Sequence, residues 1–256
     1  MVGGVTTDGD QGPVPPSSAE RRAVLAENLR RLRERIGRAC QAAGRDPAQI
    51  TVIAVTKTFP ASDIRLLHEL GIRDIGENRD QEARAKRAAL AAKGMDPDVL
   101  RWHFVGALQT NKCRSVARYA ALVHSVDRPE QLPRLAAGAR DVGRVLPCLI
   151  QVNLDPPAVT GSRRGVPPAE ALGLADLLTD VPELALRGVM GIAPVDGDPR
   201  LAFETLAEVA HRLHERYPDA TIMSAGMSGD LEAAIAAGAT HVRVGAALLG
   251  PRPAAG

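Results

Sequence analysis

The chain has 256 residues, of which 45% are hydrophobic and 24% charged, a composition typical of a globular protein with a large buried core. The formal net charge of +2 is too small to favour a nucleic-acid-binding protein, and the arginines alternate with glutamates. The three cysteines are far apart and no apolar run is long enough to span a bilayer, so we expect neither a disulfide framework, a zinc site nor a membrane protein. A cytoplasmic protein is expected.

The N-terminal region has two parts. Residues 1–18 are rich in Gly, Pro, Ser and Thr without apolar periodicity, and we interpret them as a disordered leader before one domain over 19–256. Apolar residues then recur at helical spacing from Leu25 to Cys40, and Gly44 follows as a stop signal. The sequence therefore predicts a long amphipathic helix.

After Gly44, short β-branched runs alternate with helical patterns. The expected strands are 50–55, 72–76, 102–106, 122–126, 145–154, 184–192, 220–224 and 241–245. The expected helices are 61–70, 79–93, 110–120, 128–140, 168–179, 199–216 and 230–237. Continuous apolar runs between helices indicate parallel strands covered by helices. Eight such units favour a single α/β fold, a (β/α)8 TIM-type barrel with an extra N-terminal helix.

Lys57 is the candidate nucleophile. It follows the apolar run 50–56, and only four of the 32 basic residues are lysines. An amine can lose its proton whereas a guanidinium cannot, so a lysine at the end of a buried strand is suited to form a Schiff base. In a barrel the chemistry lies at the C-terminal ends of the strands, which is where Lys57 is expected.

The loops after the last two strands suggest a phosphate site. The segment from Ser224 to Asp230, which includes Gly226, Met227 and Ser228, offers a hydroxyl and backbone N–H groups to a phosphate dianion. Arg243, Gly245 and Ala246 form a second glycine turn. A lysine facing a phosphate site indicates either pyridoxal 5'-phosphate (PLP) or a sugar phosphate handled by an imine-forming aldolase.

Arg243 bears on this choice. Its guanidinium at the end of the last strand is suited to donate to the pyridine nitrogen of PLP, which keeps that nitrogen unprotonated. The alternative is that Arg243 pairs with a carboxylate such as Glu77. The residues alone leave both interpretations open. His103 and His124 lie within apolar strands, where a hydrogen-bonded core histidine is more common than a metal ligand, and no metal site is expected.

Several segments together resemble the pyridoxal phosphate homeostasis protein family. They are Ala54–Thr58, Gly76–Glu82, Trp102–Lys112, His124–Asp127, Gly226–Asp230 and Arg243–Gly245, in that order along the chain. The resemblance implies a barrel like the N-terminal domain of alanine racemase, with PLP held as an aldimine on Lys57. It places Asn78 beside the cofactor, the phosphate on Ser228 and the amides around Gly226, Met227, Gly245 and Ala246, and Arg243 at the pyridine nitrogen. It further implies a protein that buffers PLP or delivers it to PLP-dependent apo-enzymes.

Substrate turnover is not expected. A racemase needs a second acid/base group on the opposite face of the cofactor, and Tyr119 and Tyr217 fall in helical patterns away from the site. The chain ends at Gly256, soon after the last strand, so a second domain that would supply this group is not expected. Because a lone barrel here shows no exposed apolar helix, we expect a monomer. A weak PLP-dependent amino-acid racemase and a cofactor-free imine-forming lyase remain the alternatives.

Four residues depart from the family pattern. Phe59 stands where many relatives have a second lysine, and Arg163 and Arg164 replace a Lys-Ser pair before Gly165. Ala246 stands where a threonine is common, and so removes one hydroxyl from the phosphate site. A cofactor handover that uses accessory lysines is therefore not expected.

Overall fold

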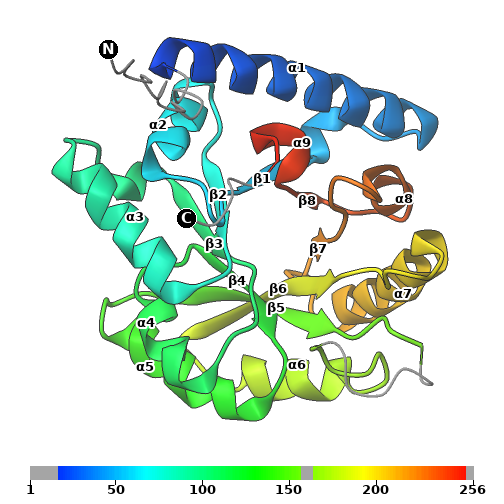
Figure 1. Ribbon diagram of the computed structural model, residues 1–256. Coiled ribbons are helices and arrows are strands. Elements are labelled where there is room, and N and C mark those ends of the chain that lie inside the picture. Colours follow the sequence, from blue (N-terminus) through cyan, green and yellow to red (C-terminus); the bar gives the residue numbers. More distant parts are fainter. Residues whose placement is uncertain (1–16, 157–163, 252–256) are drawn as a thin grey trace, which may run out of the picture.

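The computed structural model describes residues 17–156 and 164–251, which form a closed barrel of eight parallel strands surrounded by helices (Figure 1). The strands follow chain order around the barrel, and β1 pairs with β8 to close it. Their bounds are β1 Thr51–Val55, β2 Asp74–Glu77, β3 Arg101–Phe104, β4 Leu122–Val126, β5 Leu146–Val152, β6 Leu184–Gly191, β7 Ile222–Ser224 and β8 His241–Val244. The predicted (β/α)8 barrel is confirmed.

Helices cover the outside of the barrel. The α-helices are α1 Ser18–Ala42, α2 Ala61–Glu69, α3 Asp80–Ala92, α4 Cys113–Ala117, α5 Leu132–Arg140, α6 Ala171–Thr179, α7 Pro199–Arg216, α8 Leu231–Ala236 and α9 Ala246–Leu249. Short 3-10 helices are η1 Pro47–Gln49, η2 Pro97–Val99, η3 Thr110–Lys112 and η4 Pro129–Gln131. The helices expected at 110–120 and 128–140 are each a 3-10 turn followed by a shorter α-helix. The sequence did not predict α9.

Helix α1 is the expected extra helix. Residues 1–16 of the expected leader lie outside the described residues, and its last two residues belong to α1, because Ser17 is the N-cap and Ser18 the first helical residue. Ser17 and Glu20 form a capping box, which satisfies backbone N–H groups at the helix start. The apolar stripe predicted from Leu25 to Cys40 is buried and packs in one cluster with residues of α2, α8 and α9.

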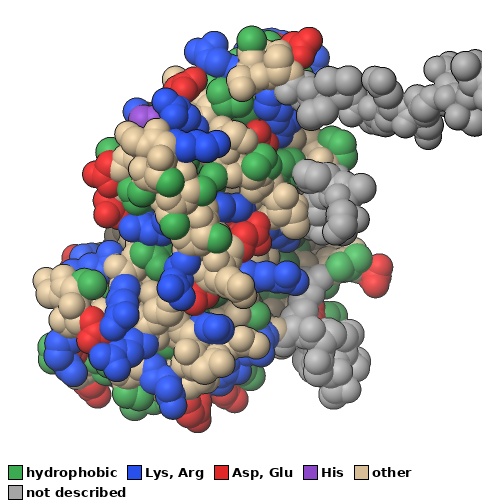
Figure 2. All heavy atoms as spheres, turned by 60° about the vertical axis from the view of Figure 1, so that its left-hand side comes forward, with side chains coloured by type: hydrophobic (Ala, Val, Ile, Leu, Met, Phe, Trp, Pro, Cys, Tyr) green, Lys and Arg blue, Asp and Glu red, His purple; other side chains and the backbone are tan. Residues whose placement is uncertain are grey.

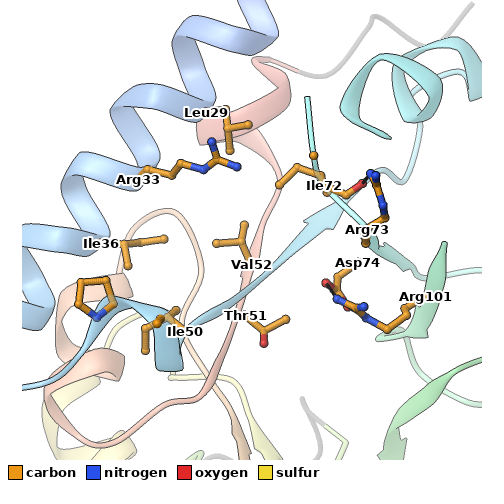
Figure 3. A pocket seen from close by; sticks show the side chains of 13 residues that line it. Leu29, Arg33, Ile36, Ile50, Thr51, Val52, Ile72, Arg73, Asp74 and Arg101 are labelled. Carbon is orange, nitrogen blue, oxygen red and sulfur yellow. Dashed lines mark hydrogen bonds and ion pairs between the residues drawn. The ribbon is translucent and has the colours of Figure 1, made fainter. Parts of the chain in front are cut away.

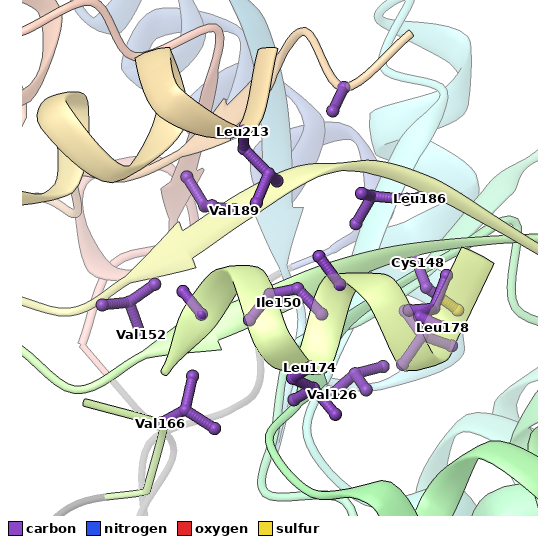
Figure 4. Packing of buried hydrophobic residues seen from close by; sticks show 14 of the residues in the cluster. Val126, Cys148, Ile150, Val152, Val166, Leu174, Leu178, Leu186, Val189 and Leu213 are labelled. Atoms are coloured by element: carbon purple, nitrogen blue, oxygen red, sulfur yellow. The ribbon is translucent and has the colours of Figure 1, made fainter. Parts of the chain in front are cut away.

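The main hydrophobic core lies between the strands and the outer helices. Figure 4 shows side chains of β5 and β6, such as Ile150 and Val189, facing Leu174 and Leu178 of α6 and Leu213 of α7. Burying each of these large side chains stabilises the fold by about 1.5–3 kcal/mol. All three cysteines are buried and free, so the fold does not depend on disulfides.

The surface charges are mixed, as expected. Figure 2 shows Lys and Arg side chains interspersed with Asp and Glu. Arg114 of α4 and Arg118, directly after α4, both pair with Asp141, and Arg140 of α5 pairs with Glu183. Within residues 17–156 and 164–251, no helix is both long enough and apolar enough to cross a membrane.

Candidate cofactor site

Lys57 lies in the turn that follows β1, and the backbone of this turn is strained. The next residue, Thr58, has φ +69°, a left-handed conformation that is unfavourable for a β-branched residue. Its N–H donates to Glu82 Oε1 at 2.6 Å, and the Phe59 N–H donates to the Thr56 carbonyl at 3.0 Å. Strain of about 1–3 kcal/mol at one residue persists only where such contacts hold it, and it occurs often at functional sites.

A buried cluster supports this turn from α3. Lys86 Nζ donates to the carbonyl oxygen of Thr56 and to Glu77 Oε1, both at 2.6 Å, and to Glu82 Oε1 at 2.7 Å. Glu77 is only 1% exposed, and burial raises its pKa although Lys86 opposes that shift. This role of Lys86 was not predicted from the sequence. The available signal was the spacing of Glu82 and Lys86, which places both on one face of a helix.

Glu77 is therefore not the partner of Arg243. Arg243 of β8 is 5% exposed, and its Nη1 and Nη2 atoms donate to Ser224 Oγ and to the Gly191 carbonyl, each at 2.8 Å. Among the described residues, Arg243 makes no ion pair with a carboxylate. Burial lowers its pKa to about 10, so the guanidinium remains a cationic donor at neutral pH. The pairing of Arg243 with Glu77 that the sequence left open is wrong.

Ser224, predicted as part of the cofactor site, belongs to a chain of buried polar side chains. Its Oγ lies 2.9 Å from His124 Nδ1, and His124 Nε2 lies 2.9 Å from His103 Nδ1. His103 Nε2 lies 2.9 Å from Asp74 Oδ1. The expectation that both histidines are hydrogen-bonded core residues is confirmed.

Asn78 lies directly after β2 and is fixed by the loop after β3. A Cβ atom on Gly106 would lie 2.2 Å from the Asn78 carbonyl oxygen, a distance that no side chain tolerates. Gly106 thus allows the two loops to pack backbone against backbone. Asn78 is half-buried at the same end of the barrel as Lys57.

The two loops of the predicted phosphate site touch each other. Ser228 Oγ accepts from the Ala247 N–H at 3.2 Å, and the Gly226 carbonyl accepts from the Arg243 N–H at 2.9 Å. Gly226 has φ +89°, which favours glycine. The Met227 N–H, predicted to contact phosphate, donates to Asp230 Oδ1 at 2.5 Å in this structure.

The loop after β8 lies close to the end of β1. An ideal Cβ on Gly245 would be 3.5 Å from the Val55 carbonyl oxygen, two residues before Lys57. Gly245 is the N-cap of α9, and Ala246 is exposed as its first residue. The structure therefore gathers the predicted residues at the C-terminal end of the barrel. Their contacts with a cofactor stay a prediction.

Two residues of these segments have local explanations, namely Phe59, which departs from the family pattern, and Gly165, which keeps it. Phe59 is 5% exposed and lies beneath the Arg21 guanidinium, 5.9 Å from its ring centroid, so it serves packing. Gly165 has φ +125°, and its position against Asn153 leaves no room for a Cβ. Arg163 lies outside the described residues. Over the described part of the chain, no group of three or more His, Cys, Asp and Glu side chains is arranged to hold a metal ion.

A family model and the relatives of known name agree on the family to which this chain is similar. Residues 23–253 match the model of the alanine racemase N-terminal domain. The pyridoxal phosphate homeostasis protein of Mycobacterium tuberculosis is 40% identical over 247 residues, covering 91% of this chain and 95% of the relative. That of Pseudomonas aeruginosa is 41% identical over 233 residues, covering 90% and 96%.

Solved structures agree with this. PipY of Synechococcus elongatus PCC7942, solved with PLP bound, has a TM-score of 0.73 and 33% identity, covering 88% of this chain and 100% of PipY. Alanine racemase of Clostridium difficile 630 has a TM-score of 0.64 at 15% identity, covering 91% of this chain and 58% of that one, and shows the shared fold alone. The chain belongs to the pyridoxal phosphate homeostasis protein family, within the fold of the alanine racemase N-terminal domain.

Proposed function

We propose that this protein binds PLP at the C-terminal end of its barrel, with Lys57 as the covalent attachment point, and takes part in PLP homeostasis without turning over a substrate. The relatives' name and the PLP-bound PipY structure support the cofactor. The observation that carries the proposal is Arg243, a buried cation at this end of the barrel whose two hydrogen bonds go to neutral oxygens of Ser224 and Gly191.

The donor set around Arg243 fits a pyridine ring. A guanidinium has five N–H donors and no acceptor, so Arg243 can offer a donor to a ring nitrogen and cannot accept a proton from it. The bound cofactor supplies an electron sink, which is weak when its ring nitrogen is unprotonated. Arg243 therefore favours holding the cofactor over activating it.

The loops after β7 and β8 fit a phosphate group. The Ser228 hydroxyl and the backbone around Gly226, Gly245 and Ala246 would hold the dianion through N–H and O–H donors. The Ser228 hydroxyl already links the two loops through the Ala247 N–H. Ala246 supplies no hydroxyl, so this site depends more on backbone donors than a site with threonine there.

The positions of the tyrosines support a protein without turnover. Both tyrosines of the chain lie in connections that lead back to the N-terminal ends of strands, since Tyr119 precedes β4 and Tyr217 follows α7. Tyr217 donates to Asp176 on the outer surface. Neither is placed to act as the acid/base partner of Lys57.

We propose that the protein acts as a monomer in the cytoplasm and exchanges PLP with apo-enzymes by transient contact. Three free cysteines, all buried, are compatible with a reducing compartment. Phe59 and Arg163 in place of lysines support an exchange that does not pass the aldehyde along a series of amines.

The test is direct attachment of the cofactor. Protein purified with PLP should absorb visible light, and borohydride reduction followed by peptide mass spectrometry should find the phosphopyridoxyl group on Lys57. Lys57→Ala should abolish both signals, whereas the matched variant Lys93→Ala, at an exposed lysine after α3, should keep them. Failure to take up PLP after reconstitution contradicts the proposal.

A further inference from the structure

A continuous chain of hydrogen bonds crosses the inside of the barrel behind Arg243. It runs from Arg243 Nη1 through Ser224, His124 and His103 to Asp74 Oδ1, with each donor–acceptor distance between 2.8 and 2.9 Å. The side chains come from five strands, β8, β7, β4, β3 and β2. None of the five residues is more than 6% exposed. Buried chains of this kind are stable only when every member is satisfied.

When the His103 and His124 imidazoles are both uncharged, only one arrangement of protons satisfies every hydrogen bond of this series. Arg243 can only donate, so the Ser224 oxygen accepts and its hydroxyl proton is free for His124 Nδ1. At the other end Asp74 is ionised, because hydrogen bonds from His103 and Arg101 outweigh the effect of burial and lower its pKa to about 2. Asp74 must therefore accept from His103 Nε2, which leaves His103 Nδ1 to accept from His124 Nε2. Every bond then donates in the direction from Arg243 to Asp74.

Asp74, the last residue of this hydrogen-bonded series, lies at the N-terminal end of the barrel, opposite Lys57. Asp74 is also held by Arg101, whose side chain is 60% exposed. Both residues line a cavity of about 550 Å³ between α1 and the N-terminal ends of β1 to β3. Figure 3 shows the Asp74 carboxylate facing Arg101 at the edge of this cavity. The hydrogen-bonded series therefore connects the Asp74–Arg101 ion pair at the N-terminal end of the barrel to the Arg243 guanidinium at the C-terminal end of the barrel.

We propose that Ser224, His124, His103 and Asp74 are positioning residues that fix the Arg243 guanidinium for its contact with the ring nitrogen of PLP. This inference rests on the proposed function. Ser224 Oγ and the Gly191 carbonyl hold two of the Arg243 nitrogens, which sets the plane of the guanidinium and the direction of its remaining donors. His124 and His103 hold Ser224 in the state in which its oxygen accepts, and Asp74 fixes the tautomers of both.

The first experiment uses the cofactor-free protein and nitrogen-15 NMR. Wild-type protein should show His103 and His124 both protonated at Nε2, a scalar coupling between His124 Nε2 and His103 Nδ1, and separate Nη resonances for a fixed Arg243 guanidinium. Ser224→Ala should average the Arg243 resonances. The matched control is Ser125→Ala, because Ser125 is also fully buried and its hydroxyl has no partner within the described residues.

The second experiment measures PLP binding by absorbance titration. Ser224→Ala should raise the dissociation constant for PLP about three- to tenfold, the loss expected for one hydrogen bond. It should also move the nitrogen-15 shift of labelled PLP toward that of a protonated ring, and Ser125→Ala should change neither. Asp74→Ala should weaken binding in the same direction from the far end of the chain. Asp141→Ala, which removes another arginine-paired carboxylate on the outer surface, should leave binding unchanged.

The two experiments separate this inference from the proposed function. If the wild-type protein does not bind PLP, the proposed function fails, while the Arg243 resonances still show whether Ser224 fixes the guanidinium. If PLP binds and Ser224→Ala matches Ser125→Ala in affinity and in both NMR signals, the positioning role is wrong. A missing coupling between the two histidines also overturns it. If Asp74→Ala does not fold, the positioning role is decided by the comparison of Ser224→Ala with Ser125→Ala and by the coupling between His124 and His103.

Discussion

Lys86 Nζ lies 2.6 Å from the carbonyl oxygen of Thr56, the residue immediately before Lys57. The turn that contains Lys57, the proposed attachment point, is therefore stabilised by a second lysine, the buried Lys86. Lys86 also neutralises Glu77 and Glu82, and Glu82 in turn accepts from the Thr58 N–H. Two of the four lysines of the chain thus belong to one turn. Lys57 offers the amine proposed to attach the cofactor, and the charged Lys86 stabilises the backbone and carboxylates beside it.

Removing the buried lysine should destabilise the protein strongly. Lys86→Ala leaves the Glu77 carboxylate buried without its cation, and breaking a buried pair in this way typically costs about 3–5 kcal/mol. Urea unfolding monitored by circular dichroism measures this loss. Lys93→Ala is the control, since Lys93 is exposed immediately after the last residue of α3, and it should lie within about 0.5 kcal/mol of wild type. A loss below about 1 kcal/mol for Lys86→Ala would contradict the role given to this cluster.

The strained residue after Lys57 gives a prediction of the opposite sign. Thr58→Gly removes a β-branched side chain from a φ of +69° and keeps the N–H that donates to Glu82. Relief of about 1–2 kcal/mol of strain exceeds the roughly 0.5–1 kcal/mol entropic cost of glycine, so the free energy of unfolding should rise by about 0.5–1 kcal/mol. Thr205→Gly inside α7 should instead lose about 0.3–0.5 kcal/mol, the difference between the helix propensities of threonine and glycine. Equal losses in both variants would show that Thr58 is not strained.

The fold was predictable from the sequence because the pattern of apolar runs repeats with each strand and helix. The last turn, α9, was missed because four residues are too few to show a helical period, and Leu248 and Leu249 are instead fixed by packing against α1. The candidate site was predictable at Lys57 and Arg243, which lie at strand ends. The partners of Arg243 were not, because Ser224 and Gly191 lie 19 and 52 residues away in the sequence and strand periodicity does not say which groups meet across a barrel.

The departure at Ala246 gives a prediction of gained affinity. Ala246 is exposed at the start of α9, so Ala246→Thr has room for a hydroxyl near the proposed phosphate position. One added hydrogen bond of about 1 kcal/mol corresponds to roughly fivefold tighter PLP binding in an absorbance titration. Ala91→Thr, on the exposed face of α3, should leave the affinity unchanged. Unchanged or weaker binding in Ala246→Thr would argue against phosphate at this loop.

Acid should destabilise the protein through its buried histidines, and His241 is the case to test. Burial, followed by the nearby His103, lowers the pKa of His241 to about 4, compared with an ordinary value of 6.5. The unfolded chain therefore binds a proton between these two pH values that the folded protein does not bind. The stability contributed by the neutral imidazole is complete above pH 6.5 and is lost as the pH falls toward 4, a loss on the order of 2–3 kcal/mol.

His241→Gln should flatten the dependence of the unfolding free energy on pH between 6.5 and 4, whatever its effect at neutral pH, because glutamine does not titrate. Urea unfolding at intervals of half a pH unit measures the slope. His211→Gln, at an exposed histidine of α7, should keep the wild-type slope. His124 is buried in the same interior, and burial lowers its pKa well below 6.5, so a residual slope should persist in His241→Gln. Parallel curves for wild type and His241→Gln would mean that the folded protein accommodates the His241 proton without loss of stability.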